Sequence, residues 1–292
     1  MKRIFFQVIF FLLALSLDAA SLKVSPGGFM VQNISPGKTY NLQETTKIKL
    51  SIFNDDTSTH TYALTVHKPS SVGNWERGYF EIHDPAWCWF SPSDVTICPQ
   101  KVGYGNLFFK IPDRESYYNQ RWVATIGILG KQEQGIGFGL GIYVRVQIET
   151  EPKAETTGPP DGLIGVRPSL VSFDNIPPGG MHTQNLMIFN NDSEKRSFNI
   201  TSLSKYPDIK SSTYLTSSYS QIPDPAWISL DRNKLTIDPQ DSKSLTIKIS
   251  IPKDGNLSDK KWEEILFVEP ENGSSSFIRI RITTAKGISE QP

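Results

Sequence analysis

The chain matches itself in an ordered series of short motifs, and this repeat constrains its fold more than any other feature. Asp84-Pro-Ala-Trp87 recurs 140 residues later as Asp224-Pro-Ala-Trp227. Other matched pairs are Asn33-Ile34 with Asn175-Ile176, Ile52-Phe-Asn-Asp-Asp56 with Ile188-Phe-Asn-Asn-Asp192, Thr96-Ile-Cys-Pro-Gln100 with Thr236-Ile-Asp-Pro-Gln240, Ile111-Pro112 with Ile251-Pro252, and Trp122 with Trp262. A spacing this long is typical of a duplicated domain and too long for a solenoid repeat.

The segment between the two copies has a different composition. Residues 151–162, EPKAETTGPPDG, are dominated by Pro, Gly, Thr and charged residues, which is typical of a linker between domains. We therefore expect a first domain over residues 22–150, a linker over residues 151–162 and a second domain over residues 163–287.

The first 20 residues have the layout of a secretory signal peptide. Lys2 and Arg3 precede an almost unbroken apolar run over residues 4–17, and small residues follow it. We expect an exported protein, located in the periplasm or outside the cell. No second apolar run reaches the length of a membrane span, so we expect no span in the mature chain.

Strand patterns recur along both copies. Residues 244–251 alternate strictly, with Leu245, Ile247 and Ile249 on one face and polar side chains on the other. Residues 277–282 alternate in the same way, and turn-forming clusters separate such segments. A period of two indicates strands with one buried face, and many short strands with turns between them predict an all-β sandwich.

The pattern Trp-Ile-Ser-Leu, a turn, Leu-Thr-Ile-Asp-Pro-Gln and an alternating strand ending in Ile-Pro occupies residues 227–252. This pattern resembles the immunoglobulin-like domains of the ASH and major-sperm-protein type. The resemblance covers most of residues 22–286 and implies two tandem immunoglobulin-like β-sandwich domains after the signal peptide. Proteins with such domains are mostly scaffolds, adhesive modules or periplasmic chaperones, so the resemblance implies binding and not catalysis.

The charges and the reactive side chains exclude several functions. The chain has 30 Lys and Arg against 30 Asp and Glu, and no basic patch of the kind that binds nucleic acid. None of the histidines has zinc-ligand spacing to another ligand, and no nucleophile elbow is present. We predict no enzyme, no cofactor and no metal site.

The two cysteines, Cys88 and Cys98, are compatible with one disulfide in an oxidising compartment. They flank residues 89–97, which have the pattern of a hairpin. Strand parity places Cys88 inward and Cys98 outward, and a bulge near Pro99 would have to reconcile the two directions.

Residues that occur in one copy only are candidates for function, since shared residues serve the shared fold. The first copy is richer in aromatic residues, of which Trp75 and Trp89 are candidates for partner binding. Trp89 matches Ser229 and is expected to point outward. An outward Trp covers a sheet edge, packs on the other domain or stacks on a sugar ring, and structural packing is the favoured explanation.

The last strand of the first copy, residues 135–148, carries the second group of candidates. Its apolar residues share the core face, and its opposite face carries Gly135, Gly137, Gly139, Gly141, Tyr143, Arg145 and Gln147. We predict partner binding at Gly137, Gly139, Gly141 and Tyr143. Glycines leave a bare backbone surface, which either an aromatic such as Tyr104 or Trp122 covers, or a partner, a ligand or the second domain uses.

The leading interpretation is a non-catalytic binding or scaffold protein of the cell envelope or the secreted fraction, acting through protein–protein contacts. One alternative is a periplasmic chaperone that donates a β-strand to surface subunits. Another is a carbohydrate-binding module that uses the aromatic residues of the first copy. We expect a protein partner in the envelope or the extracellular space, a glycan as the alternative partner, and no nucleic acid.

Overall fold

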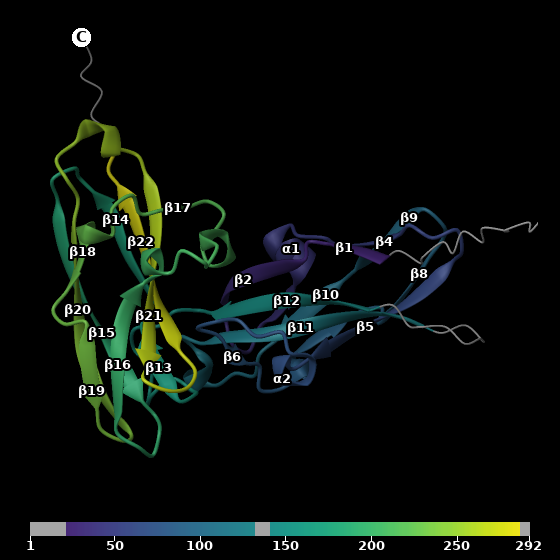
Figure 1. Ribbon diagram of the computed structural model, residues 1–292, viewed down its shortest axis with the longest axis horizontal. Coiled ribbons are helices and arrows are strands. Elements are labelled where there is room, and N and C mark those ends of the chain that lie inside the picture. Colours follow the sequence, from purple (N-terminus) through teal and green to yellow (C-terminus); the bar gives the residue numbers. More distant parts are fainter. Residues whose placement is uncertain (1–21, 132–140, 287–292) are drawn as a thin grey trace, which may run out of the picture.

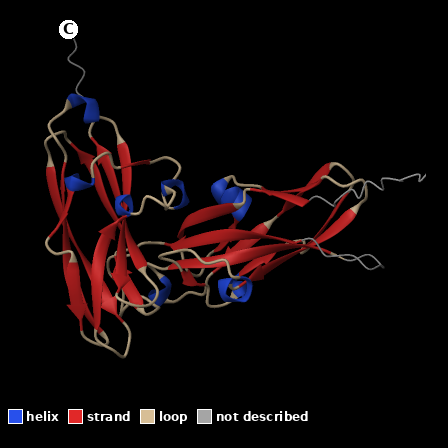
Figure 2. Cartoon of the chain, viewed as in Figure 1, coloured by secondary structure: helices blue, strands red, loops and turns tan. Residues whose placement is uncertain are grey.

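The computed structural model describes residues 22–131 and 141–286, and the segment expected as a signal peptide lies outside them. Strands dominate the secondary structure, and the few helices are short and lie in connections (Figure 2). The strands form two β-sandwiches, so the all-β fold with two immunoglobulin-like sandwiches is confirmed (Figure 1). Within the described residues, no helix combines the length and the hydropathy needed to cross a membrane.

The N-terminal sandwich packs one six-stranded sheet against a divided layer. The continuous sheet has the order β2-β12-β11-β5-β8, with β6 paired to β11, and the other layer consists of β1-β4-β9 and β3-β10-β7. The bounds are β1 Leu22–Ser25, β2 Gly28–Ile34, β3 Thr39–Asn41, β4 Leu50–Asn54, β5 His60–His67, β6 Phe80–Glu81, β7 Cys88–Phe90, β8 Asp94–Ile97, β9 Lys101–Gly105, β10 Leu107–Lys110, β11 Arg121–Gly130 and β12 Gly141–Thr150. Helix α2 spans Pro69–Val72, and single 3₁₀ turns span Pro85–Trp87 and Glu115–Tyr117.

A short helix divides the second layer of this sandwich. Helix α1, Leu42–Thr46, lies between β3 and β4, and the side chain of Asn41 caps it by accepting hydrogen bonds from the backbone N–H groups of Gln43 and Glu44. Lys47 ends the helix in the left-handed conformation, with φ of 62°. The helix interrupts the strand, so β3 and β4 belong to separate sheets.

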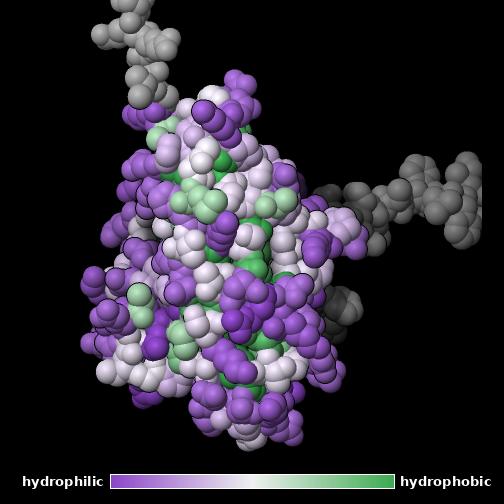
Figure 3. Space-filling view, turned by 90° about the vertical axis from the view of Figure 1, so that its left-hand side faces the viewer, coloured by the Kyte–Doolittle hydropathy of each residue, from purple (hydrophilic) through white to green (hydrophobic). Residues whose placement is uncertain are grey.

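The C-terminal sandwich has two uninterrupted sheets. Their orders are β13-β15-β20-β18 and β14-β22-β21-β16-β19, with β17 paired to β21. The bounds are β13 Ile164–Arg167, β14 Leu170–Ile176, β15 Met181–Asn190, β16 Arg196–Ser202, β17 Ser220–Gln221, β18 Ile228–Leu230, β19 Lys234–Ile237, β20 Asp241–Ser250, β21 Lys261–Pro270 and β22 Ser276–Thr284. Single 3₁₀ turns span Leu203–Lys205, Ser211–Thr213, Pro225–Trp227 and Gly255–Leu257. The surface of this sandwich that faces away from the other one is mostly hydrophilic, with hydrophobic residues visible in small separate patches (Figure 3).

Motifs shared by the two copies build the same local structure. The side chains of Asp84 and Asp224 each cap a 3₁₀ turn by accepting a hydrogen bond, 2.9 Å long, from the backbone N–H two residues later. This is the turn role expected for the repeated Asp-Pro pair. The tryptophan that ends each turn packs edge-to-face on the second shared tryptophan, with ring centroids of Trp87 and Trp122 5.4 Å apart. The shared residues therefore serve the shared fold.

One end of the N-terminal sandwich packs against the side of the C-terminal sandwich (Figure 1). The contact contains its own apolar cluster, which consists of Tyr79, Val123, Leu203, Tyr214, Ile265, Phe267 and Phe277. Gly78 allows the close approach, because its φ is +79° and a Cβ there would lie 2.6 Å from the ring of Phe277. The outer face of β21 and β22 is thus buried, although strand alternation predicted that it would face water.

A charged network lies beside this cluster and crosses the contact. Arg279 of β22 donates to Glu149 of β12 and to Glu263 of β21, with its Nη1 2.7 Å from Glu263. All three side chains are nearly or fully buried. Tyr79 donates to Glu149 over 2.7 Å, and Arg281 donates to Glu263 over 2.8 Å. Burial by itself raises the pKa of Glu149, but Arg279 and Arg121 lower it to about 2.

A second buried carboxyl lies inside the C-terminal sandwich itself. Glu264 is on β21 between Trp262 and Leu266, on the face that packs the core. Its Oε1 accepts hydrogen bonds from the hydroxyl of Ser202 and the backbone N–H of Ile265, each 3.1 Å long. Burial raises the pKa of Glu264 to about 7, more than the hydrogen bonds from Ile265, Ser202 and the backbone of Leu203 lower it.

Replacing Arg279 by Met should destabilise the protein strongly. The substitution leaves the buried carboxylates of Glu149 and Glu263 without their shared cation, and losing one member of such a group costs about 3–5 kcal/mol. Urea unfolding at neutral pH, followed by tryptophan fluorescence, measures the loss. The control is Arg232→Met, which breaks an exposed pair with Asp231 and should cost at most about 1 kcal/mol. Equal losses in the two variants would contradict the assigned role.

Glu264 should make stability fall as pH rises. Its pKa is raised from 4.5 to about 7 on folding, so the folded state binds the proton more tightly, and ionisation costs stability between these two values. The difference corresponds to about 3 kcal/mol, present below pH 4.5 and lost above pH 7. Urea unfolding of the parent and of Glu264→Gln from pH 5 to pH 8 measures it. The two profiles should converge at low pH and separate as the parent loses stability, whereas parallel profiles would contradict the assignment.

Candidate functional site

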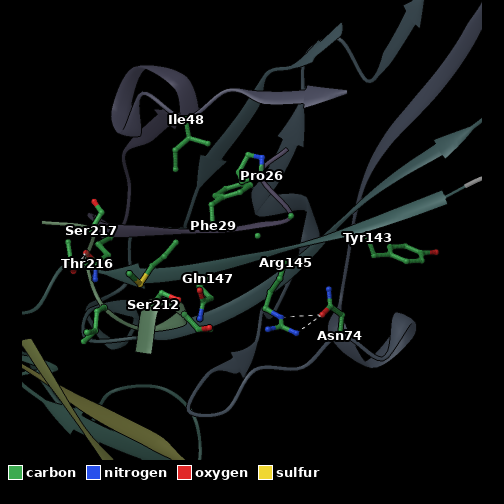
Figure 4. A pocket seen from close by; sticks show the side chains of 16 residues that line it. Pro26, Phe29, Ile48, Asn74, Tyr143, Arg145, Gln147, Ser212, Thr216 and Ser217 are labelled. Carbon is green, nitrogen blue, oxygen red and sulfur yellow. Dashed lines mark hydrogen bonds between the residues drawn. The ribbon is translucent and has the colours of Figure 1, made fainter. Parts of the chain in front are cut away.

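The outer face of β12 leads into a cleft beside the contact between the two sandwiches. The cleft has a volume of about 650 Å³ and lies between β2, β12 and the chain at residues 212–217 (Figure 4). Its wall on β12 is made by Tyr143, Arg145 and Gln147, which alternate along the strand and therefore share one face. Its opposite wall contributes Ser212, Thr216 and Ser217.

Arg145 is held in place at the wall of the cleft. Its guanidinium donates to the side-chain oxygen of Asn74 from Nε over 3.2 Å and from Nη2 over 2.8 Å (Figure 4). It also pairs with Glu76, which compensates its charge. Arg145 therefore presents a cation in a fixed position to the cleft. The charge of this cation is already balanced by Glu76.

Gln147 gives the cleft its unsatisfied polar group. Its side chain is only 5% exposed, and its Nε2 is buried without a hydrogen-bond partner. A buried amide N–H without a partner costs about 1–3 kcal/mol, so an acceptor gains a hydrogen bond there once the Gln147 side chain turns towards the cleft.

The edge of the sheet is open beside this cleft. β12 pairs with β11 from Gly141 to Glu149, but its pairing with β2 begins only at Arg145. Before that point the chain turns at Pro26 and Gly27 and continues as β1, which pairs with β4 in the other layer. Among residues 22–131 and 141–286, residues 141–144 of β12 hydrogen-bond to a strand on the β11 side only, and β1 lies near the other side without pairing.

The structure describes two of the four residues of this strand that were predicted to bind a partner. Gly137 and Gly139 lie outside the described residues. A Cβ at Gly141 would lie 2.7 Å from Leu129, so a leucine of the neighbouring strand covers this glycine, and not Tyr104 or Trp122. Tyr143 lines the cleft, is 44% exposed and packs edge-on against His67, with ring centroids 5.9 Å apart.

The two candidate tryptophans do not line this cleft. Trp75 is 52% exposed in the chain that follows α2. Trp89 points outward, as the alternation of β7 predicts, and stacks on Phe108 with ring centroids 5.6 Å apart and planes 13° apart. Phe108 covers one face of Trp89, which gives the outward tryptophan a packing role.

The expected disulfide between Cys88 and Cys98 is absent, and both thiols are free. The hairpin on which the prediction depended does not form, since β7 pairs with β10 whereas β8 pairs with β5 in the opposite sheet. Cys88 belongs to the core of the sandwich, where burial raises the pKa of its thiol, and Cys98 is exposed. The chain between them crosses from one layer to the other, which explains their opposite directions.

Arg145 and Gln147 are the cleft residues that the sequence-based selection missed. The only signal for them was their position on the strand face of Tyr143, two and four residues further along. Among residues 22–131 and 141–286, no group of three or more His, Cys, Asp or Glu side chains could hold a metal ion.

No family model and no curated protein matches this sequence. Three solved structures with a similar arrangement are a protein of unknown function from Porphyromonas gingivalis W83, the E. coli chaperone DraB and an ASH/PapD-like domain of human CEP192. Their identities to this chain are 12%, 12% and 10%, and their TM-scores are 0.35, 0.32 and 0.31. The alignments cover 90%, 89% and 54% of this chain, and 99%, 98% and 100% of the other chains. Similarity at this level carries no argument about function, which must come from the chain's own structure.

Proposed function

We propose that this protein is an exported, non-catalytic binding protein that captures an extended segment of a protein partner along the open edge of β12. The observation that carries the proposal is the free edge at residues 141–144 beside the cleft that holds the unpartnered Nε2 of Gln147. An extended segment would extend the sheet with its main chain, and one of its carbonyl groups would accept from Gln147.

Two further features support capture of a chain segment. A buried charged network and an apolar cluster fix the contact between the sandwiches, so the walls of the cleft are in place before binding. Tyr143 is exposed next to the free edge, and tyrosine provides a large contact area with little loss of side-chain entropy.

The domain layout and the compartment belong to the same proposal. We infer that residues 1–20 direct export, that residues 22–150 and 163–287 form the two domains, and that residues 151–162 connect them. A binding protein with this layout would act in the periplasm or outside the cell, on a partner in the envelope or the extracellular space. Disulfide formation is not required, since Cys88 is packed as an apolar core residue.

In a second candidate function, the same edge strand is donated to a partner. As a chaperone, the protein would donate β12 to an incomplete sandwich of a surface subunit, and not only receive a segment. The free edge and the alternating apolar residues of β12 favour this candidate, because Ile142 and Val144 follow the period of a strand with one buried face. The carbohydrate-binding alternative has less support, since Phe108 already covers one face of Trp89.

Photo-crosslinking in the intact envelope tests the proposal. A benzophenone amino acid at Tyr143 should form a discrete adduct with a protein partner, and Gln147→Ala in the same chain should reduce its yield by about tenfold, the equivalent of one lost hydrogen bond. The control is the same crosslinker at Tyr104, an exposed aromatic residue of β9.

Identical adducts at both positions, or an adduct that Gln147→Ala leaves unchanged, would overturn the proposal. Mass spectrometry of the crosslinked peptide separates the two candidates. A crosslink to an edge strand of a folded partner indicates capture, and a crosslink inside the hydrophobic groove of a subunit that lacks a strand indicates donation.

A further inference from the structure

The outer face of the divided layer of the N-terminal sandwich exposes apolar side chains. Trp89 of β7 is 37% exposed, and Val102 and Tyr104 of β9 are 40% and 56% exposed. They are three of the seven exposed large hydrophobic residues among residues 22–131 and 141–286. β4 and β9 lie at the end of this sandwich that points away from the C-terminal one (Figure 1). None of the three residues lines the cleft beside β12.

Most of this surface belongs to one continuous stretch of chain. β10 follows β9 directly and keeps its alternation, so Val102, Tyr104, Phe108 and Lys110 point outward while Leu107 is buried in the core. Side chains stand roughly perpendicular to a sheet, so outward residues along one stretch form an extended surface. Such a surface favours a partner that is itself extended over a small ligand.

The C-terminal sandwich has polar residues at the same places. Trp89 and Phe108 face each other across β7 and β10, and Ser229 and Lys248 face each other across β18 and β20. Val102 and Tyr104 likewise correspond to serines, at positions 242 and 244. The shared fold therefore does not require apolar side chains on this surface. Exposed apolar residues that the fold does not need are typical of an interaction site.

The charges on this layer are basic. Its six strands contain three lysines and no Asp or Glu. Lys23 of β1 is neutralised by Asp55. Lys110 on β10 and Lys49, directly before β4, form no ion pair with an acidic side chain of the part of the chain that the structure describes, and both are exposed. The ammonium of Lys49 lies 5.6 Å from the ring centroid of Tyr104, so basic and aromatic groups share one surface.

The two exposed rings suit a lipid interface better than a sugar. Trp89 is stacked on Phe108, and Lys49 covers Tyr104, so each ring has one face occupied and offers less area for stacking on a sugar ring. Trp and Tyr combine an apolar ring with one polar group, and such residues collect at the headgroup level of membranes. Lysines beside them bind anionic headgroups.

We propose that the outer face of the divided layer binds an anionic phospholipid surface, with Trp89, Val102 and Tyr104 at the headgroup level and Lys49 and Lys110 at the lipid phosphates. β12 belongs to the opposite sheet of this sandwich, and the two layers pack through their inner faces. Lipid binding would therefore leave the cleft beside β12 accessible. The site goes beyond the proposed function and does not depend on it.

Flotation of the mature chain with lipid vesicles tests the proposal without any protein partner. At low ionic strength, the chain should bind vesicles of phosphatidylglycerol about 25-fold more tightly than vesicles of phosphatidylcholine, since each unpaired lysine contributes on the order of fivefold at an anionic surface. In about 1 M salt, where the screening length falls to about 3 Å, this preference should disappear.

Two double variants separate the contributions of charge and apolar surface. Lys49→Gln with Lys110→Gln should lower the affinity for phosphatidylglycerol to nearly that for phosphatidylcholine. Val102→Ser with Tyr104→Ser introduces the residues of the second copy and should weaken binding to both lipids by about tenfold, because apolar contact area is lost.

The matched controls lie in the C-terminal sandwich. Lys243→Gln with Lys248→Gln removes two exposed lysines of β20, and Met181→Ser removes an apolar residue that is 60% exposed. Both should bind vesicles like the parent, and thermal unfolding verifies that every variant folds. No binding of the parent to phosphatidylglycerol, as expected for a surface that serves a protein or a glycan, would overturn the proposal. Equal affinity for the two lipids at low ionic strength, or equal losses in the test and control variants, would overturn it as well.

Discussion

The ion group formed by Arg279, Glu149 and Glu263 is the interaction on which the arrangement of the molecule depends. Arg279 comes from the C-terminal sandwich and Glu149 from the N-terminal one, and both are buried. The two carboxylates can both hydrogen-bond to the guanidinium of Arg279 only when the sandwiches keep one relative position. Hydrogen bonds from Tyr79 and Arg281 extend the group on both sides. The contact therefore has a defined geometry that an apolar cluster alone would not specify.

The geometry of the candidate cleft follows from that contact. The residues 212–217 that form its far wall precede β17 and are held near β2 by a hydrogen bond from Thr216 to Gln32, 3.0 Å long. Gln32 also donates to Glu149 over 3.0 Å, so the wall is connected to the ion group. A partner segment at the edge of β12 would meet a cleft whose width is set by these interactions and not by the partner.

The duplication separates residues that serve the fold from residues that are free for function. Asn33 and Asn175 both adopt positive φ, 60° and 55°, at the same point of the repeat, and asparagine tolerates this conformation better than most residues. Such shared positions explain the common sandwich. The differences are concentrated elsewhere: α1 divides one layer of the first copy, and Glu264 with Ser202 replaces an apolar pair in the second.

The sequence by itself determined the two copies, the all-β fold and the direction of individual side chains such as Trp89. These properties depend on local periodicity and on turn residues, which are readable along the chain. Only the tertiary structure decided which outer faces are covered. Alternation places Arg279 and Arg281 opposite the core, but the other sandwich buries that face. Likewise, residues 88–98 have the pattern of a hairpin, yet their strands pair with partners in opposite sheets, which separates Cys88 from Cys98. The cleft at Gln147 exists because two domains meet there, and no pattern within one strand encodes a contact between domains.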